Sequence, residues 1–163
     1  MTPLYGWAPI GKRVIDHVPH GHWKTTTFVA ALRHDGLTAP MVVDGAINGE
    51  LFLAYVEQIL LPTLREGEIV VLDNLSSHKV AGVEKAIVSA GAQVLYLPPY
   101  SPDFNPIENV FSKLKTMLRK LKLRTIEELW KKLGKLCEIF SSDECKNYCR
   151  KAGYKKIPVQ SIS

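Results

Sequence analysis

Apolar residues recur along the chain at two spacings, and each spacing predicts a different kind of element. Short runs rich in β-branched residues predict strands, whereas apolar residues three and four positions apart predict helices. Strands alternate with helices after about residue 48, so we expect the last two strands to pair in parallel. The first three strands have no helix between them, and we expect them to form an antiparallel meander. The predicted strands are residues 13–18, 25–32, 40–43, 69–72 and 93–97, with helices from Asn48 to about Leu60 and from about Lys79 to Gly91.

The last third of the chain carries three helical patterns. The second and third patterns each start with a hydroxyl residue that is followed three positions later by Glu, which is a capping-box arrangement. The first has apolar residues at the spacing of one packed helix face. The sequence therefore predicts an α/β protein with C-terminal helices over about residues 106–153. The first predicted helix begins at Pro106, and the other two are 125–140 and 141–153; the packed face of the first contains Ile107, Val110, Phe111, Leu114, Met117, Leu118 and Leu121.

Length and composition limit the chain to one core. With 163 residues and 46% hydrophobic content, we interpret residues 1–163 as a single domain. No apolar run approaches the roughly 20 residues of a membrane span, and no signal-peptide pattern is present, so we expect a cytosolic protein without membrane contact. The three cysteines have no paired spacing, which argues against a disulfide framework or a zinc ribbon.

Basic charge is concentrated in the last third of the chain. Residues 1–110 carry 7 Lys or Arg against 11 Asp or Glu, whereas residues 111–163 carry 14 against 5. The net charges of −4 and +9 give the overall +5. This asymmetry predicts a surface for a polyanion, and the alternative is a set of solvated helix faces.

Three of these basic residues share one face of the helix that begins at Pro106. At about 100° per residue, Lys115, Arg119 and Lys122 fall within roughly 40° of Glu108. A cationic stripe that leads away from a carboxylate can hold phosphates on either side of a scissile bond. We therefore expect DNA as the partner of this helix.

Two acidic residues, Asp73 and Glu108, stand 35 positions apart, where a predicted strand ends and a predicted helix begins. They can meet at one edge of a sheet, and carboxylate oxygens are ligands for Mg²⁺ or Mn²⁺. Each acid also has a structural interpretation. Asp73 can be a turn residue at a strand end, and Glu108 can complete a capping box with Asn105 as the N-cap.

Three polar residues are close to these acids in the sequence. His78 could orient the Asp73 loop or contact DNA, or it could be a polar residue near a helix start. Asn74 could support a metal ligand or form a simple turn. We group Asn74, His78 and Asn105 as residues that support the site or lie near DNA.

Four motifs carry a resemblance to a known family. They are Gly6-Trp7-Ala8-Pro9, His22-Trp23-Lys24-Thr25, Asp73-Asn74 with His78, and the string Pro98-Pro99-Tyr100-Ser101-Pro102-Asp103-Phe104-Asn105-Pro106-Ile107-Glu108. Together they resemble the catalytic domain of bacterial insertion-sequence transposases of the mariner-like superfamily, over about residues 4–154. The order of the predicted elements is that of a ribonuclease H-like fold, a mixed sheet flanked by helices, whose first strand is truncated or missing.

The resemblance implies a function and a site. Asp73 is identified as the second acid of a DDE triad and Glu108 as the third, with two Mg²⁺ or Mn²⁺ ions in the intact enzyme. The intact enzyme is expected to cut DNA at transposon ends and to join the freed 3′-hydroxyl to target DNA. It is also expected to act as a homodimer in the bacterial cytosol.

One feature of the family pattern has no counterpart in this sequence. The first acid of the family lies on a strand shortly before the segment that resembles Gly6-Trp7-Ala8-Pro9, and the sequence begins at Met1, after that point. Asp16, Asp35 and Asp44 each fall on a later strand or turn than this acid, and Asp44 is the best substitute among them. We therefore expect this chain alone to be inactive. The alternatives are a non-catalytic DNA-binding or dimerisation remnant of a decayed insertion sequence, and a nuclease that recruits Asp44.

Overall fold

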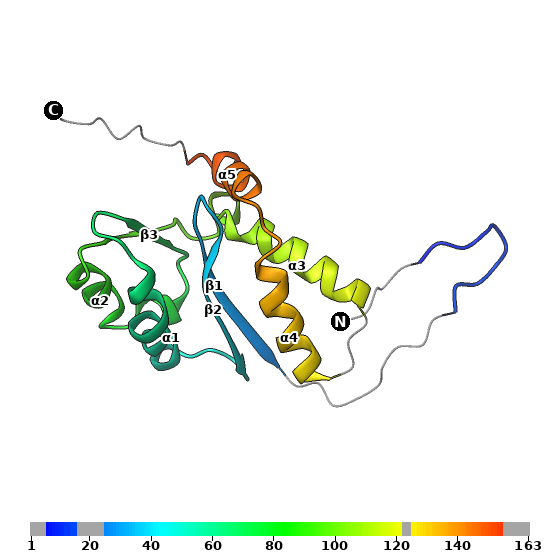
Figure 1. The fold of residues 1–163 in the computed structure, drawn as a ribbon, viewed down its shortest axis with the longest axis horizontal. Coiled ribbons are helices and arrows are strands. Elements are labelled where there is room, and N and C mark those ends of the chain that lie inside the picture. The colour runs from blue at the N-terminus through cyan, green and yellow to red at the C-terminus, as the bar shows by residue number, and fades with distance from the viewer. Residues whose placement is uncertain (1–5, 16–24, 122–124, 155–163) are drawn as a thin grey trace.

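The computed structural model of the chain describes residues 6–15, 25–121 and 125–154, which form a mixed α/β fold (Figure 1). The strands are β1 (Thr26–Leu32), β2 (Leu37–Asp44), β3 (Ile69–Leu72) and β4 (Gln93–Tyr96). The helices are α1 (Gly49–Tyr55), α2 (Val83–Ser89), α3 (Ile107–Leu121), α4 (Ile126–Cys137) and α5 (Ser142–Lys151). None of the described helices is long and apolar enough to cross a membrane.

The strands form two small sheets. β1 and β2 pair antiparallel, with Thr26 opposite Asp44 and Leu32 opposite Leu37. β3 and β4 pair in parallel, from Ile69 opposite Gln93 to Leu72 opposite Tyr96, which confirms the parallel pairing predicted from the alternation of strands and helices. Each strand therefore has one hydrogen-bonded neighbour among the described residues.

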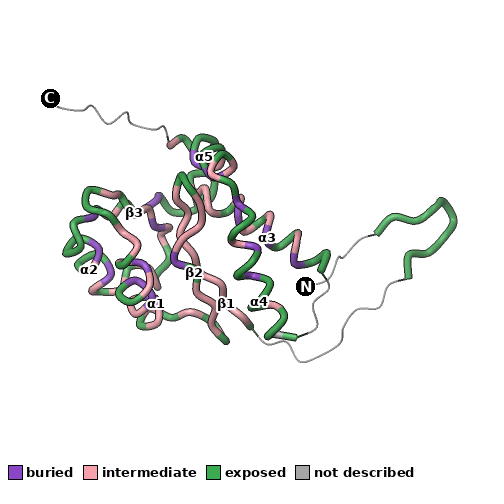
Figure 2. The backbone as a smooth tube through the Cα atoms, viewed as in Figure 1, coloured by how far each residue is buried: buried purple, intermediate pink, exposed green. Residues whose placement is uncertain are grey.

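The β1–β2 hairpin lies between α1, α2 and β3 on one side and α3 and α4 on the other (Figures 1 and 2). Side chains alternate across a strand, so neighbouring residues of β1 enter different cores. Val29 packs against the core of α1, α2, β3 and β4, and Phe28 packs against the core of α3, α4 and α5. The Phe28 and Phe111 rings meet edge to face, with centroids 6.1 Å apart. The most deeply buried side chains of the two cores are Val56, Val83, Ile87, Val110 and Cys145.

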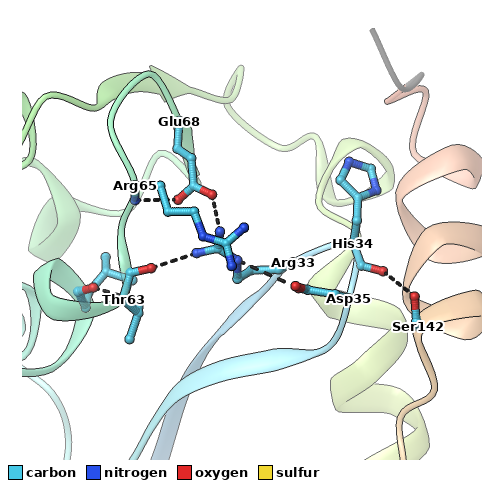
Figure 3. Close-up of polar contacts among 8 residues, drawn as sticks. Arg33, His34, Asp35, Thr63, Arg65, Glu68 and Ser142 are labelled. Carbon is cyan, nitrogen blue, oxygen red and sulfur yellow. Dashed lines mark hydrogen bonds and ion pairs between the residues drawn. The ribbon is translucent and has the colours of Figure 1, made fainter. Parts of the chain in front are cut away.

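An arginine at the end of β1 joins the hairpin to the segment that leads into β3 (Figure 3). Arg33 Nη1 donates to the Thr63 carbonyl at 2.8 Å, and its Nη2 forms an ion pair with Glu68. The other Glu68 oxygen accepts from the Arg65 amide at 3.0 Å. These contacts fix the hairpin relative to the start of β3, and hence relative to the loop that follows β3.

The structure corrects three expectations about local elements. Residues 13–15 are not part of a strand, and residues 16–18 of that predicted strand lie outside the described residues. The helix expected near Lys79 begins at Val83, because Gly82, with φ of +110°, interrupts the chain after a 3₁₀ turn at Ser76–Lys79. Leu121 is the last residue of α3 and is 41% exposed, so it does not belong to the packed face.

Other local expectations are confirmed. Asn48 caps α1 by accepting from the Leu51 amide at 2.8 Å. The hydroxyls of Thr125 and Ser141 accept from the amides three positions later and cap α4 and α5. The three cysteines are free thiols, and Cys145 and Cys149 are buried.

Candidate functional site

The two parallel strands end at the same edge of their sheet. Asp73 follows β3 at this edge, and the connection to α3 follows β4. Asp73 directly follows β3, whose last residue, Leu72, lies opposite Tyr96. The Leu97 amide continues this ladder by donating to the Leu72 carbonyl at 2.8 Å. The chain then turns through residues 98–106 into α3. In α/β folds, the carboxyl ends of parallel strands are where ligands bind.

Asp73 is held by one of its two carboxylate oxygens. Its Oδ1 accepts from the Leu75 amide at 3.3 Å and lies 2.5 Å from His78 Nδ1. The first contact is an Asx turn, which a side chain of this length forms readily after a strand. Oδ2 has no hydrogen-bond partner among the described residues. The Asp73 side chain is 34% exposed, so this second oxygen belongs to a group that solvent reaches.

His78 is fixed from two further sides. Its ring stacks on Phe52 of α1, with centroids 4.1 Å apart and planes at 29°. Its carbonyl accepts from Tyr96 Oη at 3.4 Å. The structure thus places His78 against Asp73 and holds it with two aromatic residues. The sequence predicts Phe52 and Tyr96 only as residues of a helix and a strand. An apolar pattern does not indicate which aromatic ring will pack against a histidine.

Glu108 lies in the first turn of α3 and is exposed. Its amide donates to the Asn105 carbonyl at 3.2 Å. Neither half of a capping box is formed, because the Glu108 amide uses the Asn105 backbone carbonyl and not its side chain, and the Asn105 amide donates to the Pro102 carbonyl at 2.9 Å. The Glu108 carboxylate makes no hydrogen bond or ion pair with any described residue. Within the described residues it is therefore an unpaired carboxylate in the first turn of a 15-residue helix.

The remaining predicted site residues take different positions. Asn74 Oδ1 is buried and has no hydrogen-bond partner among the described residues, whereas Asn105 is half-buried at the entrance to α3. Lys115 and Arg119 are exposed on α3 without an ion-pair partner in the described part of the chain. Lys122 lies outside the described residues.

The donor chemistry at this edge fits a divalent cation such as Mg²⁺ or Mn²⁺. Asp73 Oδ2 and the Glu108 carboxylate are hard oxygen donors without a partner among the described residues, and the buried amide oxygen of Asn74, the residue after Asp73, also lacks a partner there. The number of donors is smaller than a two-ion site requires. The described residues contain no group of three His, Cys, Asp or Glu side chains placed to hold a metal ion.

Asp44 does not complete such a group within the described residues. Asp44 is exposed at the end of β2. The described residues contain no metal-binding group of three that includes it with Asp73 and Glu108. Asp35 instead faces Arg33, with Oδ1 3.8 Å from Nε. The structure therefore gives no support to Asp44 as a substitute acid.

An α/β fold that presents carboxylates beside a strand end and cations along the adjoining helix is typical of metal-dependent enzymes that act on nucleic acids. The sequence comparison agrees with this class. Residues 1–133 match the family described as DDE superfamily endonuclease, and the chain belongs to this family. A search of curated proteins by sequence found no match.

Solved structures show the same ribonuclease H-like fold. The chain matches the Mos1 strand transfer complex with a TM-score of 0.73 and 17% identity, over 91% of this chain and 46% of that chain. It matches a Mos1 paired-end complex with the left transposon end with a TM-score of 0.71 and 16% identity, over 91% and 46%. For the Mos1 catalytic domain with raltegravir and Mn, the TM-score is 0.68 at 16% identity, over 79% and 75%. The chain thus spans less than half of the Mos1 chains in the DNA complexes.

Proposed function

We propose that the chain is the catalytic-domain portion of a DNA transposase, which cuts DNA at transposon ends in a metal-dependent reaction and then joins the freed end to target DNA. The proposal is supported by two carboxylates without a partner for their free oxygens among the described residues: Asp73, which directly follows β3, and Glu108, in the first turn of α3. Membership of the DDE endonuclease family supports the same assignment.

In this proposal Asp73 and Glu108 are the metal ligands. Divalent cations bound there supply an activated water and neutralise charge on the phosphorus oxygens. The neighbouring residues keep Asp73 in place. The Leu75 amide donates to Oδ1 and His78 Nδ1 lies next to the same oxygen without a hydrogen bond, which leaves Oδ2 as the ligand oxygen. Glu108 offers its whole carboxylate, because nothing in the described structure competes for it.

Two carboxylates are too few for two cations, so we propose that these 163 residues alone do not cut DNA. A third acid must reach the same edge. β1 and β3 each pair with only one strand among the described residues, so each has a further backbone edge free. A strand that ends in Asp and pairs there brings a carboxylate to the same end as Asp73, if it runs parallel to β3.

Nicking of supercoiled plasmid in Mn²⁺ tests this proposal. We expect nicking when a short apolar peptide that ends in Asp is added to the chain, and no nicking with a matched peptide that ends in Asn. The activity should disappear in Asp73→Asn. Mn²⁺-dependent nicking by the chain without peptide that survives Asp73→Asn would contradict the assignment and would point to another site.

We also propose that Lys115, Arg119 and Lys122 contact the phosphates of the bound DNA. Lys115 and Arg119 support this role because both are exposed on the helix that starts with Glu108, and neither is neutralised by a described carboxylate. The Mos1 neighbours include complexes with transposon ends, which supports DNA as the partner. In the full-length enzyme we propose a homodimer that holds two transposon ends, in the cytosol of a bacterium that carries the insertion sequence.

The double variant Lys115→Gln/Arg119→Gln is expected to weaken DNA binding and to reduce the slope of log K against log salt by about 1 for each lost phosphate contact. Binding of a labelled duplex measured by fluorescence anisotropy at several salt concentrations checks this. Lys131→Gln/Lys132→Gln on α4 is the matched control, since it removes the same charge elsewhere. An equal slope for the stripe variant and wild type would return these residues to a solvated helix face.

A further inference from the structure

Helix α5 lies outside the residues that match the family, which end at residue 133, so the family assigns it no role. It nevertheless makes polar contacts with α3 at two places. One set joins the start of α5 to the middle of α3. The other joins the end of α5 to the segment around Glu108.

The first set anchors α5. Lys113 Nζ lies 2.7 Å from both oxygens of Glu144 and 4.8 Å from the centroid of the Phe140 ring. Tyr148 Oη donates to Glu144 at 2.5 Å. Hydrogen bonds from Lys113 and then from Tyr148 lower the pKa of Glu144, while burial raises the pKa of Tyr148 to about 12. Because both partners stay in their hydrogen-bonding forms near neutral pH, the anchor holds α5 along α3.

The second set contacts the chain on both sides of Glu108. Tyr154 Oη donates to the Phe104 carbonyl at 2.9 Å, four residues before Glu108. Lys151 Nζ donates to Asn109 Oδ1 at 3.2 Å, one residue after it. The Asn109 side chain in turn donates to the Pro106 carbonyl at 3.4 Å. The residue after Glu108 is thus tied to Lys151, the last residue of α5, and the turn before Glu108 is tied to Tyr154, three residues beyond the helix.

Glu108 needs such support because its own carboxylate has no partner in the described structure. Its position is set by the backbone of the first turn of α3, where helix ends ordinarily fray. We propose that the end of α5 sets the position of Glu108 as a metal ligand, with Tyr154 and Lys151 as the positioning residues. This inference rests on the proposed function, because it assumes that Glu108 binds the cation.

The test compares Mn²⁺ affinity and amide exchange at residues 104–109 in the full 163-residue chain. Tyr154→Phe and Lys151→Met are each expected to weaken Mn²⁺ binding about fivefold, the effect of one lost hydrogen bond, and to speed exchange at these amides. Lys151→Arg keeps a donor and should restore both. Two controls on the same helix are Lys146→Met, whose lysine pairs with Asp143 of α5, and Tyr148→Phe, which removes one hydrogen bond of the anchor and keeps the contacts of Tyr154 and Lys151.

The controls separate positioning from general stability. If Tyr148→Phe weakens Mn²⁺ binding as much as Tyr154→Phe does, the effect is one of stability and the inference is overturned. It is also overturned if Glu108→Gln weakens Mn²⁺ binding while Tyr154→Phe and Lys151→Met do not. If Glu108→Gln itself leaves Mn²⁺ affinity unchanged, the proposed function has failed at Glu108, and the positioning role falls with it.

Discussion

Replacing Asp73 by Asn is expected to weaken Mn²⁺ binding by the chain at least tenfold, the lower end of the roughly 10–100-fold losses that follow changes merely adjacent to a metal ligand. The substitution removes the negative charge and the ligand strength of Oδ2. It keeps an oxygen that can accept from the Leu75 amide, so the turn after β3 is retained. Isothermal titration of wild type and variant with Mn²⁺ measures the effect.

Asp103→Asn is the matched control for this prediction. Asp103 is an exposed carboxylate in the turn before α3, and it has no partner in the described part of the chain. Its loss should leave Mn²⁺ affinity unchanged. Equal affinities of wild type and Asp73→Asn, or equal losses in both variants, would show that the chain binds the cation through diffuse surface charge and not through a site at Asp73.

The largest effect on stability is expected from Leu114→Ala, which should lower the free energy of unfolding by about 2–5 kcal/mol. Leu114 is 2% exposed, and it belongs to the core between the hairpin and helices α3, α4 and α5. Truncation removes buried methyl groups and leaves a cavity that the surrounding side chains fill only in part. Urea unfolding followed by circular dichroism measures the difference.

Leu121→Ala provides the contrast within the same helix. The sequence pattern puts Leu114 and Leu121 on one apolar face, whereas the structure buries the first and leaves the second 41% exposed. The loss for Leu121→Ala is expected to stay within about 0.5 kcal/mol. Similar losses for the two variants would mean that α3 is packed along its whole length, against the structure described above.

The sequence predicted elements best where local chemistry decides the structure. The run at residues 69–72 became β3 with the same bounds, and the caps at Asn48, Thr125 and Ser141 formed as expected. The start of α2 was wrong because apolar spacing continues through Gly82, and spacing does not register a residue with positive φ. Apolar periodicity thus locates elements and leaves their ends to backbone conformation.

The candidate site was accessible from sequence only in part. Asp73 and Glu108 stood out because one ends a strand and the other opens a helix within a specific motif. The support around them depends on contacts between distant residues, such as Phe52 with His78 and Tyr154 with Phe104, 50 positions apart. No local pattern encodes such pairs, so the role of α5 becomes visible only in the folded chain.

The central claim is that Asp73 and Glu108 bind one divalent-cation centre. Paramagnetic broadening by Mn²⁺ in the amide NMR spectrum of the chain tests it most directly, because the effect reports which residues lie near the ion. If both residues bind the ion, we expect substoichiometric Mn²⁺ to broaden the amides of residues 73–75 and 107–109 first. Asp73→Asn should then remove the broadening at both segments. Broadening that begins at the acidic first turns of α4 or α5, with residues 73–75 and 107–109 unaffected, would contradict it.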